Sequence, residues 1–331
     1  MIITRTPFRI SFFGGGTDYP TWYGENGGAV LATTIDKYCY ISCRRLPQFF
    51  EHKHRIVYSV IEDVRKISEI QHPAVRAVLG WAGIEEGLEI HHDGDLPARS
   101  GLGSSSSFTV GLVHALHALN GRMISKKDLA SEVIHIEQNI IGENVGSQDQ
   151  VSAAFGGFNR IDFHRNDTFD VSPIILPQNR HEELHSHFML CFTGFSRIAS
   201  DIAKSKIENL KNRTVEISRM REMVDEAIGI LNNSNTPIEE FGKLLDLSWK
   251  YKRSLSEQVS TTQIDDIYDE AQRAGAIGGK ILGAGGGGFM LLFAKPEKQA
   301  AIRERLKNLV HVPFNFEDSG SRVVLYQPNG L

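Results

Sequence analysis

The sequence predicts an α+β protein with two domains, and three observations support this prediction. The chain has 331 residues, which at roughly 100–200 residues per domain corresponds to about two domains. Several β-prone runs precede the first clear helix, an order that argues against a regular alternation of strands and helices. A polar connection over 164–186 then leads into a half that contains long helices. We therefore expect domains over 1–180 and 181–331.

Composition narrows the class of protein. Hydrophobic residues make up 41% and charged residues 23%, and the formal net charge is −4, whereas a nucleic-acid-binding protein normally has a basic excess or stripe. No run of about 18 or more apolar residues predicts a transmembrane helix, and the first residues do not resemble a signal peptide. The three cysteines are too few for a disulfide framework. We expect a cytoplasmic protein with neither a nucleic-acid nor a membrane partner.

The first strand ends in a glycine turn. Residues 2–13 read as a strand that stops at Gly14-Gly15-Gly16, where the backbone must turn tightly or approach another group closely. Thr17 and Asp18 follow at once. An aspartate in such a turn most often bonds its own backbone. Its carboxylate could equally bind ligand hydroxyls, and the turn alone leaves both interpretations open.

After strands expected over 29–42, 55–61 and 88–91, and a short helix over 73–83, the sequence LPARSGLGSSSSF has the features of a phosphate-binding turn. Its two glycines let the main chain approach a bulky anion. Four serines follow at the start of a helix whose apolar residues recur at three- and four-residue spacing. The unpaired N–H groups and positive dipole end of a helix attract anions. The alternative is an ordinary serine-capped helix after a glycine turn.

Two acidic residues further along can be interpreted from their local sequence. Ser125 and Asp128 form a capping box that opens the next helix. Glu137 lies at the margin of the buried stripe of this helix, either as a solvated edge residue or as a ligand of a divalent cation. Asp149 precedes a glycine pair and, judged locally, caps a helix. The local sequence does not choose between these interpretations.

The second half contains another glycine-rich turn, 283–288, between strands expected over 280–282 and 289–293. A helix over 296–309 and two final strands are expected to complete the second domain. The elements that precede the turn are a strand over 187–193 and helices over 197–232, 237–255 and 263–274.

This second turn is not a dinucleotide-binding motif. Gly283, Gly285 and Gly288 match G-x-G-x-x-G, but a strand follows where the motif requires a helix. A Walker A loop is also absent, because Ala274 and Ile281 stand where it needs glycine and Ser or Thr. The three separate glycine-rich segments instead predict a cleft between two domains, lined by all three.

In their order and residues, these segments resemble the three motifs of the GHMP kinases, a family named for galactokinase, homoserine kinase, mevalonate kinase and phosphomevalonate kinase. Within the family, the sequences SFFGGGTDYP and RSGLGSSSSF and the run Thr33–Tyr38 are most similar to the heptose 7-phosphate kinase branch, with fucokinase domains as neighbours. Gly15-Gly16 replaces the Glu-His of galactokinases, which weakens galactose as the substrate. The residues that match the motifs are Pro7, Arg9, Gly14 and Thr17-Asp18-Tyr19, then Pro97 to Ser106, then Gly283–Gly288.

The resemblance implies a ribosomal-protein-like first domain, a ferredoxin-like α+β second domain and an active site in the cleft between them. It implies that ATP, with Mg²⁺, phosphorylates a sugar. In the heptose branch the acceptor is the anomeric C1 hydroxyl of D-glycero-D-manno-heptose 7-phosphate, and the 1,7-bisphosphate serves nucleotide-activated heptose synthesis. The alternatives are a fucokinase- or galactokinase-like kinase of a free sugar and a non-catalytic sugar-sensing protein. Whether the chain forms a homodimer is left open.

The resemblance also implies roles for single residues. Asp149 would act as general base with Arg9 beside it, and Ser105 and Glu137 would bind Mg²⁺. The implied ATP-binding residues are Pro97, Gly101, Leu102, Gly103, Ser104, Ser105 and Ser106. The implied substrate-binding residues are Gly15, Gly16, Thr17, Asp18, Gly285, Gly286 and Gly287. The unranked candidates for binding a distal sugar phosphate are Lys37, Arg44, Arg45, Arg99 and Arg197.

Overall fold

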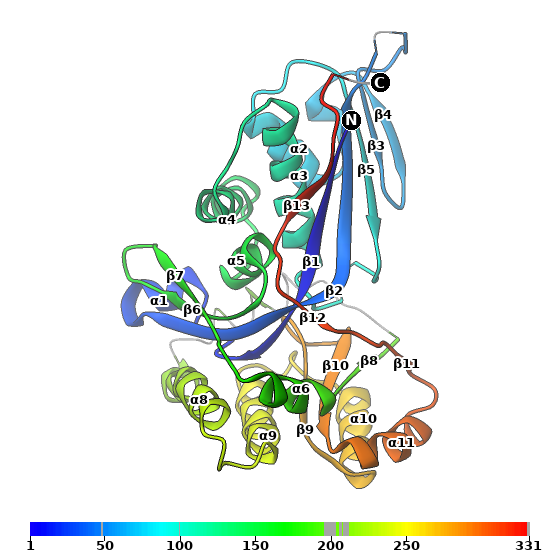
Figure 1. The fold of residues 1–331 in the computed structure, drawn as a ribbon. Coiled ribbons are helices and arrows are strands. Elements are labelled where there is room, and N and C mark those ends of the chain that lie inside the picture. Colours follow the sequence, from blue (N-terminus) through cyan, green and yellow to red (C-terminus); the bar gives the residue numbers. More distant parts are fainter. Residues whose placement is uncertain (48, 99, 195–202, 205–206, 208–211, 330–331) are drawn as a thin grey trace.

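The structure is a computed structural model that describes residues 1–329 apart from 48, 99, 195–202, 205–206 and 208–211 (Figure 1). Arg99 and Arg197, two of the candidates for binding a distal phosphate, lie outside the described residues, as does most of the first part of the helix expected over 197–232.

Two β-sheets organise the described part of the chain. The larger has nine strands, with the order β13-β1-β2-β5-β3-β4; in addition, β12 and β6 pair with β2, and β7 pairs with β6. The smaller has the order β11-β8-β10-β9. The strands of the larger sheet are β1 (Ile2–Phe13), β2 (Gly28–Arg45), β3 (His54–Val57), β4 (Ile61–Val64), β5 (Leu88–Gly94), β6 (Phe158–Phe163), β7 (Phe169–Pro173), β12 (Phe316–Glu317) and β13 (Arg322–Tyr326). Those of the smaller sheet are β8 (Phe188–Phe192), β9 (Ala276–Ile281), β10 (Phe289–Ala294) and β11 (Val310–His311).

The long antiparallel pair of β1 and β2 forms the centre of the molecule. Helices α2 to α5 lie beside the larger sheet, and α9 to α11 lie with the smaller one (Figure 1). Helix α8 packs against α9 and against β1 and β2. The first-half helices are α1 (Pro20–Asn26), α2 (Pro73–Trp81), α3 (Ser104–Leu119), α4 (Lys126–His135), α5 (Gln148–Phe155) and α6 (Gln178–Ser186), with a 3₁₀ turn at Ile67–Glu69 and a π-helix at Ile136–Ile141. The second-half helices are α8 (Thr214–Asn232), α9 (Glu239–Ser254), α10 (Thr262–Arg273) and α11 (Pro296–Arg305).

Helix α3 is almost completely buried and lies directly on the β1–β2 pair. Gly111 permits this close approach, because a Cβ atom there would lie 3.0 Å from Thr6 Oγ1 and 3.1 Å from a side-chain carbon of Ile41. The Thr4 hydroxyl donates to the Gly111 carbonyl across the same contact, at 2.9 Å. The sheet therefore fixes the position of the N-terminus of α3, which begins at the serine run.

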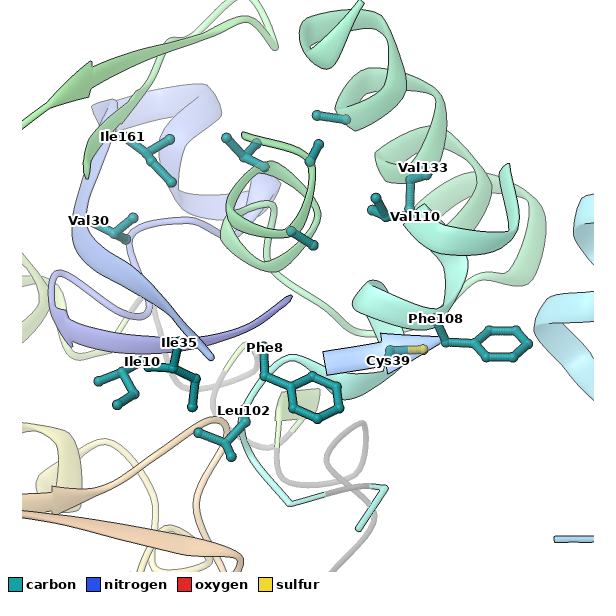
Figure 2. Close-up of a cluster of buried hydrophobic side chains, with 14 of the residues drawn as sticks. Phe8, Ile10, Val30, Ile35, Cys39, Leu102, Phe108, Val110, Val133 and Ile161 are labelled. Atoms are coloured by element: carbon teal, nitrogen blue, oxygen red, sulfur yellow. The ribbon is translucent and has the colours of Figure 1, made fainter. Parts of the chain in front are cut away.

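The core beneath this N-terminus is apolar. Figure 2 shows Phe8 and Ile10 of β1, Ile35 of β2 and Leu102 close together, and all four are at most 2% exposed. Leu102 is thus a core residue within the glycine-serine turn. Its burial holds the turn against β1, where the Arg9 N–H donates to the Leu102 carbonyl at 3.0 Å.

Several expectations about the elements are wrong in detail. The two final strands do not belong to the second domain: β12 pairs with β2 and β13 with β1 in the larger sheet. The strand expected over 55–61 is a β3–β4 hairpin that turns where the Tyr58 N–H donates to the Val60 carbonyl. The connection over 164–186 contains β7 and α6. Helix α6 was not predicted because only two of its side chains, Arg180 and Leu184, are buried. Its sequence therefore has almost no apolar periodicity.

Candidate active site

The predicted cleft exists, and all three glycine-rich segments contribute to it. A cavity lies between the turn after β1, the N-terminus of α3, the start of α5 and the turn after β9. Its walls include Arg9, Gly15, Gly16, Asp18, Gly101, Gly103, Ser104, Ser105, Ser106, Asp149, Gly283 and Ala284.

The second and third glycine segments touch each other. Gly101 and Gly283 have φ angles of +85° and +68°, which disfavour any residue with a Cβ atom. A Cβ atom on Gly283 would also lie 2.5 Å from the Gly101 Cα atom, and one on Gly101 would lie 2.5 Å from the Leu282 carbonyl oxygen. The Phe289 N–H donates to the Ser100 carbonyl at 3.1 Å. The two halves of the chain therefore meet backbone to backbone at the cavity.

The N-terminus of α3 opens toward the cavity. Gly103 is left-handed, with φ +73°, just before the first helical residue. Ser104 and Ser105 line the cavity, whereas the Ser107 hydroxyl donates to the Pro7 carbonyl at 2.9 Å and so anchors the helix to β1. The first backbone N–H groups of this helix and its positive dipole end form a site suited to phosphate.

Arg9 and Asp149 form a bidentate ion pair beside this helix end. Arg9 Nε and Nη2 donate to the two carboxylate oxygens of Asp149, each at 2.9 Å. Arg9 Nη1 donates to the Gly101 carbonyl at 2.6 Å. The side chain of Arg9 is only 4% exposed, whereas that of Asp149 is 26% exposed and lines the cavity. The guanidinium thus holds the carboxylate in one orientation next to the phosphate-binding turn, with Gly103 immediately adjacent.

Asp149 lies in the first turn of α5, a helix that was not predicted. Its buried residues are mostly small or polar, such as Ser152, Ala153 and Ala154, so the apolar pattern is too weak to identify it. The expectation that Asp149 caps a helix is also wrong, because the N-cap residue is Ser147. The helix presents its Asp149 side chain to Arg9 instead.

Glu137 is fully buried behind the α3 serines rather than at a solvated edge. It is 1% exposed, and its Oε2 accepts hydrogen bonds from the Ser106 hydroxyl at 2.8 Å and from the Gln150 amide at 2.5 Å. Among the described residues, Oε1 has no hydrogen-bond partner. Burial raises the pKa of this carboxyl to about 7. Ser106, rather than Ser105, makes the contact with Glu137.

Asp18 makes the local bond of an aspartate turn and also lies at the cavity. Its Oδ1 accepts from the Gly16 N–H at 2.8 Å, as in a local aspartate turn, while Oδ2 accepts from the Gln148 amide at 2.8 Å. The residue is 3% exposed and contributes to the cavity wall. Burial raises the pKa of Asp18 above its ordinary value, and the nearby Asp149 charge adds to this rise. The hydrogen bond from Gly16 acts in the opposite direction.

Several predicted site residues lie outside the cavity wall. Thr17 is buried and donates to the Gly14 and Ala29 carbonyls, so it shapes the turn. Pro97 is exposed, and Leu102 is in the core. In the glycine turn after β9, the Gly286 N–H donates to the Val259 carbonyl at 2.9 Å. The other predicted residues outside the wall are Glu137, Gly285, Gly286 and Gly287.

The described candidates for a distal phosphate are paired elsewhere. Lys37 contacts Asp36, Arg44 contacts Glu89, and Arg45 contacts Glu86. The residues around the cavity that were missed include Ser11, Gln148, Lys252 and Lys280, together with 143–146 and Ala203. Gln148 could have been noticed as the neighbour of Asp149. The two lysines carry no motif signal, because α9 and β9 bring them to the cavity only in the folded chain.

Comparison with known proteins agrees with this geometry. The family model described as the GHMP kinases N terminal domain matches residues 56–157, and that of the GHMP kinases C terminal matches 230–311. The D-glycero-alpha-D-manno-heptose 7-phosphate kinase of Campylobacter jejuni is 30% identical over 318 residues, which cover 92% of this chain and 93% of that protein.

Two solved structures have the same fold. A D-glycero-D-manno-heptose 1-phosphate kinase from Bacteroides thetaiotaomicron superposes with a TM-score of 0.79 at 23% identity, covering 98% of both chains. The galactokinase of Lactococcus lactis, complexed with galactose, gives a TM-score of 0.72 at 20% identity, covering 97% of this chain and 94% of that one. The two matched domains and the sequence identity together show that this chain belongs to the GHMP kinases and is a phosphotransferase that uses ATP.

Proposed function

We propose that the protein transfers the γ-phosphoryl group of MgATP to the anomeric C1 hydroxyl of D-glycero-D-manno-heptose 7-phosphate. The hydroxyl oxygen forms the new bond to phosphorus, the bond from the γ-phosphorus to the β,γ-bridging oxygen breaks, and ADP and the 1,7-bisphosphate result. The choice of acceptor is supported by the relative of 30% identity, which is named for this heptose phosphate. The observation that carries the chemistry is the Arg9–Asp149 pair at the N-terminus of α3.

The N-terminus of α3 binds the ATP phosphates in this proposal. Ser104 and Ser105 face the cavity, and Gly101 and Gly103 leave room for phosphate oxygens close to the main chain. Phosphoryl transfer depends mainly on positioning and on neutralising charge. The contact between Gly101 and Gly283 couples this cradle to the second half of the chain.

Asp149 accepts the proton of the acceptor hydroxyl. Arg9 holds both carboxylate oxygens and is itself held by the Gly101 carbonyl, so the base is fixed relative to the phosphate cradle. Asp18, held by Gly16 and Gln148, contacts the sugar.

The residues around Glu137 fit a magnesium ion. Mg²⁺ takes one or two carboxylates together with substrate phosphate oxygens and water, and the Oε1 atom of Glu137 is a buried oxygen without a partner among the described residues. Glu137 and Ser105 would hold the ion, and Ser106 would orient the carboxylate through its bond to Oε2. Bound there, Mg²⁺ would neutralise charge on the ATP phosphates.

The test is MgATP-dependent ADP release with a panel of acceptors: D-glycero-D-manno-heptose 7-phosphate, mannose 6-phosphate, fucose, galactose, mevalonate and homoserine. We expect turnover of the heptose phosphate at the highest kcat/KM. Turnover with free fucose or galactose alone would refute the proposed acceptor and leave a kinase of a free sugar. Binding of ATP without turnover of any acceptor would refute catalysis and favour a sugar-sensing protein.

A further inference from the structure

We infer that Ser11 and Gln148 select the acceptor by binding hydroxyl groups of the sugar in the space that Gly15 leaves open. This inference rests on the proposed function, because it concerns how the same cavity binds the acceptor. All three residues line the cavity. Ser11 and Gln148 belong to none of the three glycine motifs, so this subsite arises from the fold.

Gln148 has an amide oxygen that none of the described residues uses. The residue is 8% exposed, its Nε2 donates to Asp18 Oδ2 at 2.8 Å, and its Oε1 is buried without a hydrogen-bond partner in the described part of the chain. A carboxylate oxygen only accepts hydrogen bonds, so Asp18 fixes which end of the amide faces it and leaves Oε1 for a donor. A hydroxyl group can donate, whereas a fully ionised phosphate group cannot. The amide oxygen therefore suits an uncharged part of the acceptor.

Ser11 adds a second polar atom of this kind. It follows Arg9 by two residues on β1, and side chains two apart on a strand share a face, so both line the cavity while Ile10 and Phe12 are in the core. Ser11 is 6% exposed, and its Oγ atom is buried with no hydrogen-bond partner among the described residues. A buried polar atom without a partner costs free energy. A sugar hydroxyl, which both donates and accepts, would satisfy it.

Gly15 keeps the space next to these two side chains open. Its neighbours Gly14 and Gly16 have φ angles of +81° and +108°, which favour glycine, whereas Gly15 is not in the left-handed region. A Cβ atom on Gly15 would lie 3.8 Å from Gln148 Nε2 and 3.8 Å from Ser11 Oγ, at ordinary van der Waals distance. The fold therefore tolerates a side chain at position 15, and the glycine leaves room there for a ligand group.

The subsite is built on the same two elements as the proposed base. Gln148 precedes Asp149 on α5, and Ser11 shares a face of β1 with Arg9. The two hydrogen bonds from Arg9 to Asp149, each at 2.9 Å, join these elements. Hydroxyl groups held by Ser11 and Gln148 would therefore fix the sugar relative to Asp149. Loss of the subsite should lower kcat/KM for the acceptor and leave the binding of ATP unchanged.

The first test is steady-state phosphorylation of D-glycero-D-manno-heptose 7-phosphate by Ser11→Ala and Gly15→Ala. Ser11→Ala removes one hydroxyl, and we expect kcat/KM for the acceptor to fall by about 3- to 10-fold, as for the loss of one neutral hydrogen bond. Gly15→Ala places a methyl group in the subsite, and we expect a fall of about 5- to 100-fold, as for an overfilled site. The KM for ATP should change less than about threefold in both variants.

Each variant has a matched control outside the cavity wall. Ser248→Ala also removes a buried hydroxyl without a described partner, on α9. Gly80→Ala adds a methyl group on α2, where a Cβ atom would meet no other segment within 4 Å. Both controls should phosphorylate the acceptor as the wild type does. Thermal unfolding should give Ser11→Ala and Ser248→Ala melting temperatures at or above that of the wild type, because neither loses a described hydrogen bond, so a kinetic loss in Ser11→Ala is not a loss of folding.

The second test identifies the hydroxyl that Gln148 binds, with mono-deoxy analogues of the acceptor at C2, C3, C4 and C6. In the wild type, removing the bound hydroxyl should lower kcat/KM by about 3- to 10-fold. In Gln148→Met the same removal should cost less than about twofold, because the amide oxygen is already missing. Removing the other hydroxyls should cost the same in both enzymes. Comparing analogues within one enzyme cancels the loss of the bond between Gln148 and Asp18, which affects all of them alike.

Failure of the inference can be told apart from failure of the proposed acceptor. A wild type that phosphorylates heptose 7-phosphate, with Ser11→Ala and Gly15→Ala unchanged in kcat/KM, would overturn the inference alone. Equal costs of every hydroxyl removal in the wild type and Gln148→Met, or a rise only in the KM for ATP, would overturn it too. A wild type that phosphorylates only a free sugar would refute the proposed acceptor, and the same variants measured with that sugar would still decide the inference. If no acceptor turns over, calorimetric affinities for the sugar that binds take the place of kcat/KM.

Discussion

Replacing Asp149 with asparagine tests the chemistry at the centre of the cavity. The substitution keeps the size of the side chain but removes its charge and its ability to accept a proton. In the structure both carboxylate oxygens accept from Arg9, at 2.9 Å each. Asparagine offers one oxygen acceptor, so its amide group would face one of the two guanidinium donors.

Two effects of different size follow from this geometry. Arg9 is 4% exposed, and a buried donor that loses its partner costs about 1–3 kcal/mol, so we expect a loss of stability of that order. A positioned general base contributes about 10²–10⁴-fold to the rate, so we expect kcat to fall by that factor. The KM for ATP should change little, since the proposed function assigns the ATP phosphates to Ser104 and Ser105, which line the cavity.

The assay is steady-state phosphorylation of the acceptor, with MgATP binding measured separately by calorimetry and folding by thermal unfolding. Asp162→Asn is the matched control: Asp162 also accepts two bonds from one arginine, Arg160, and is also 26% exposed, but it does not line the cavity. An Asp149→Asn variant that binds MgATP normally and retains near wild-type kcat would refute the assignment of Asp149 as the base.

Three further predictions concern the walls of the cavity. Gly283→Ala should lower the melting temperature and raise the KM for ATP, because its Cβ atom would lie 2.5 Å from the Gly101 Cα atom; an unchanged melting temperature would contradict the close contact. The pKa of Glu137 is raised from 4.5 to about 7 by burial. Its contribution to stability is therefore complete below about pH 4.5 and is lost as pH rises to about 7, by up to about 3 kcal/mol. Thermal unfolding of the free protein should show this decline in the wild type and a weaker one in Glu137→Gln; equal slopes would contradict it. Asp18→Asn should raise the KM for the acceptor by about tenfold without changing the KM for ATP. A selective loss of ATP affinity would contradict the proposed contact between Asp18 and the sugar.

Much of the site was predictable because its elements are local in sequence. Glycines at positive φ and serines at a helix start are required by the backbone conformation of their own segment, and the structure has Gly101 and Gly103 at φ +85° and +73°. The N-cap half of the capping box predicted at Ser125 is confirmed, since the Ser125 hydroxyl accepts from the Asp128 N–H; the Asp128 carboxylate accepts from the same hydroxyl. These features depend on neighbours a few residues away.

Other features depend on packing and could not be predicted in the same way. Helix α5 has too few apolar residues for a periodic signal, and the π-helix that contains Glu137 directly continues α4. Burial then determines that Glu137 faces Ser106 and Gln150 rather than solvent. The last two strands join the larger sheet by pairing with β1 and β2. These pairings link opposite ends of the chain, so the order of the sequence does not reveal them.

By itself, the sequence determined the three glycine-rich turns, the helix that begins at the serines, most of the strands and, through resemblance, the family. Only the tertiary structure decided which charges reach the cavity. Lys280 meets the Phe12 carbonyl across a separation of 268 residues, while Lys37, Arg44 and Arg45 pair with acidic residues elsewhere. A turn or cap is fixed by interactions within a few residues of chain, whereas the partner of a buried charge is fixed by which distant segments the core brings together.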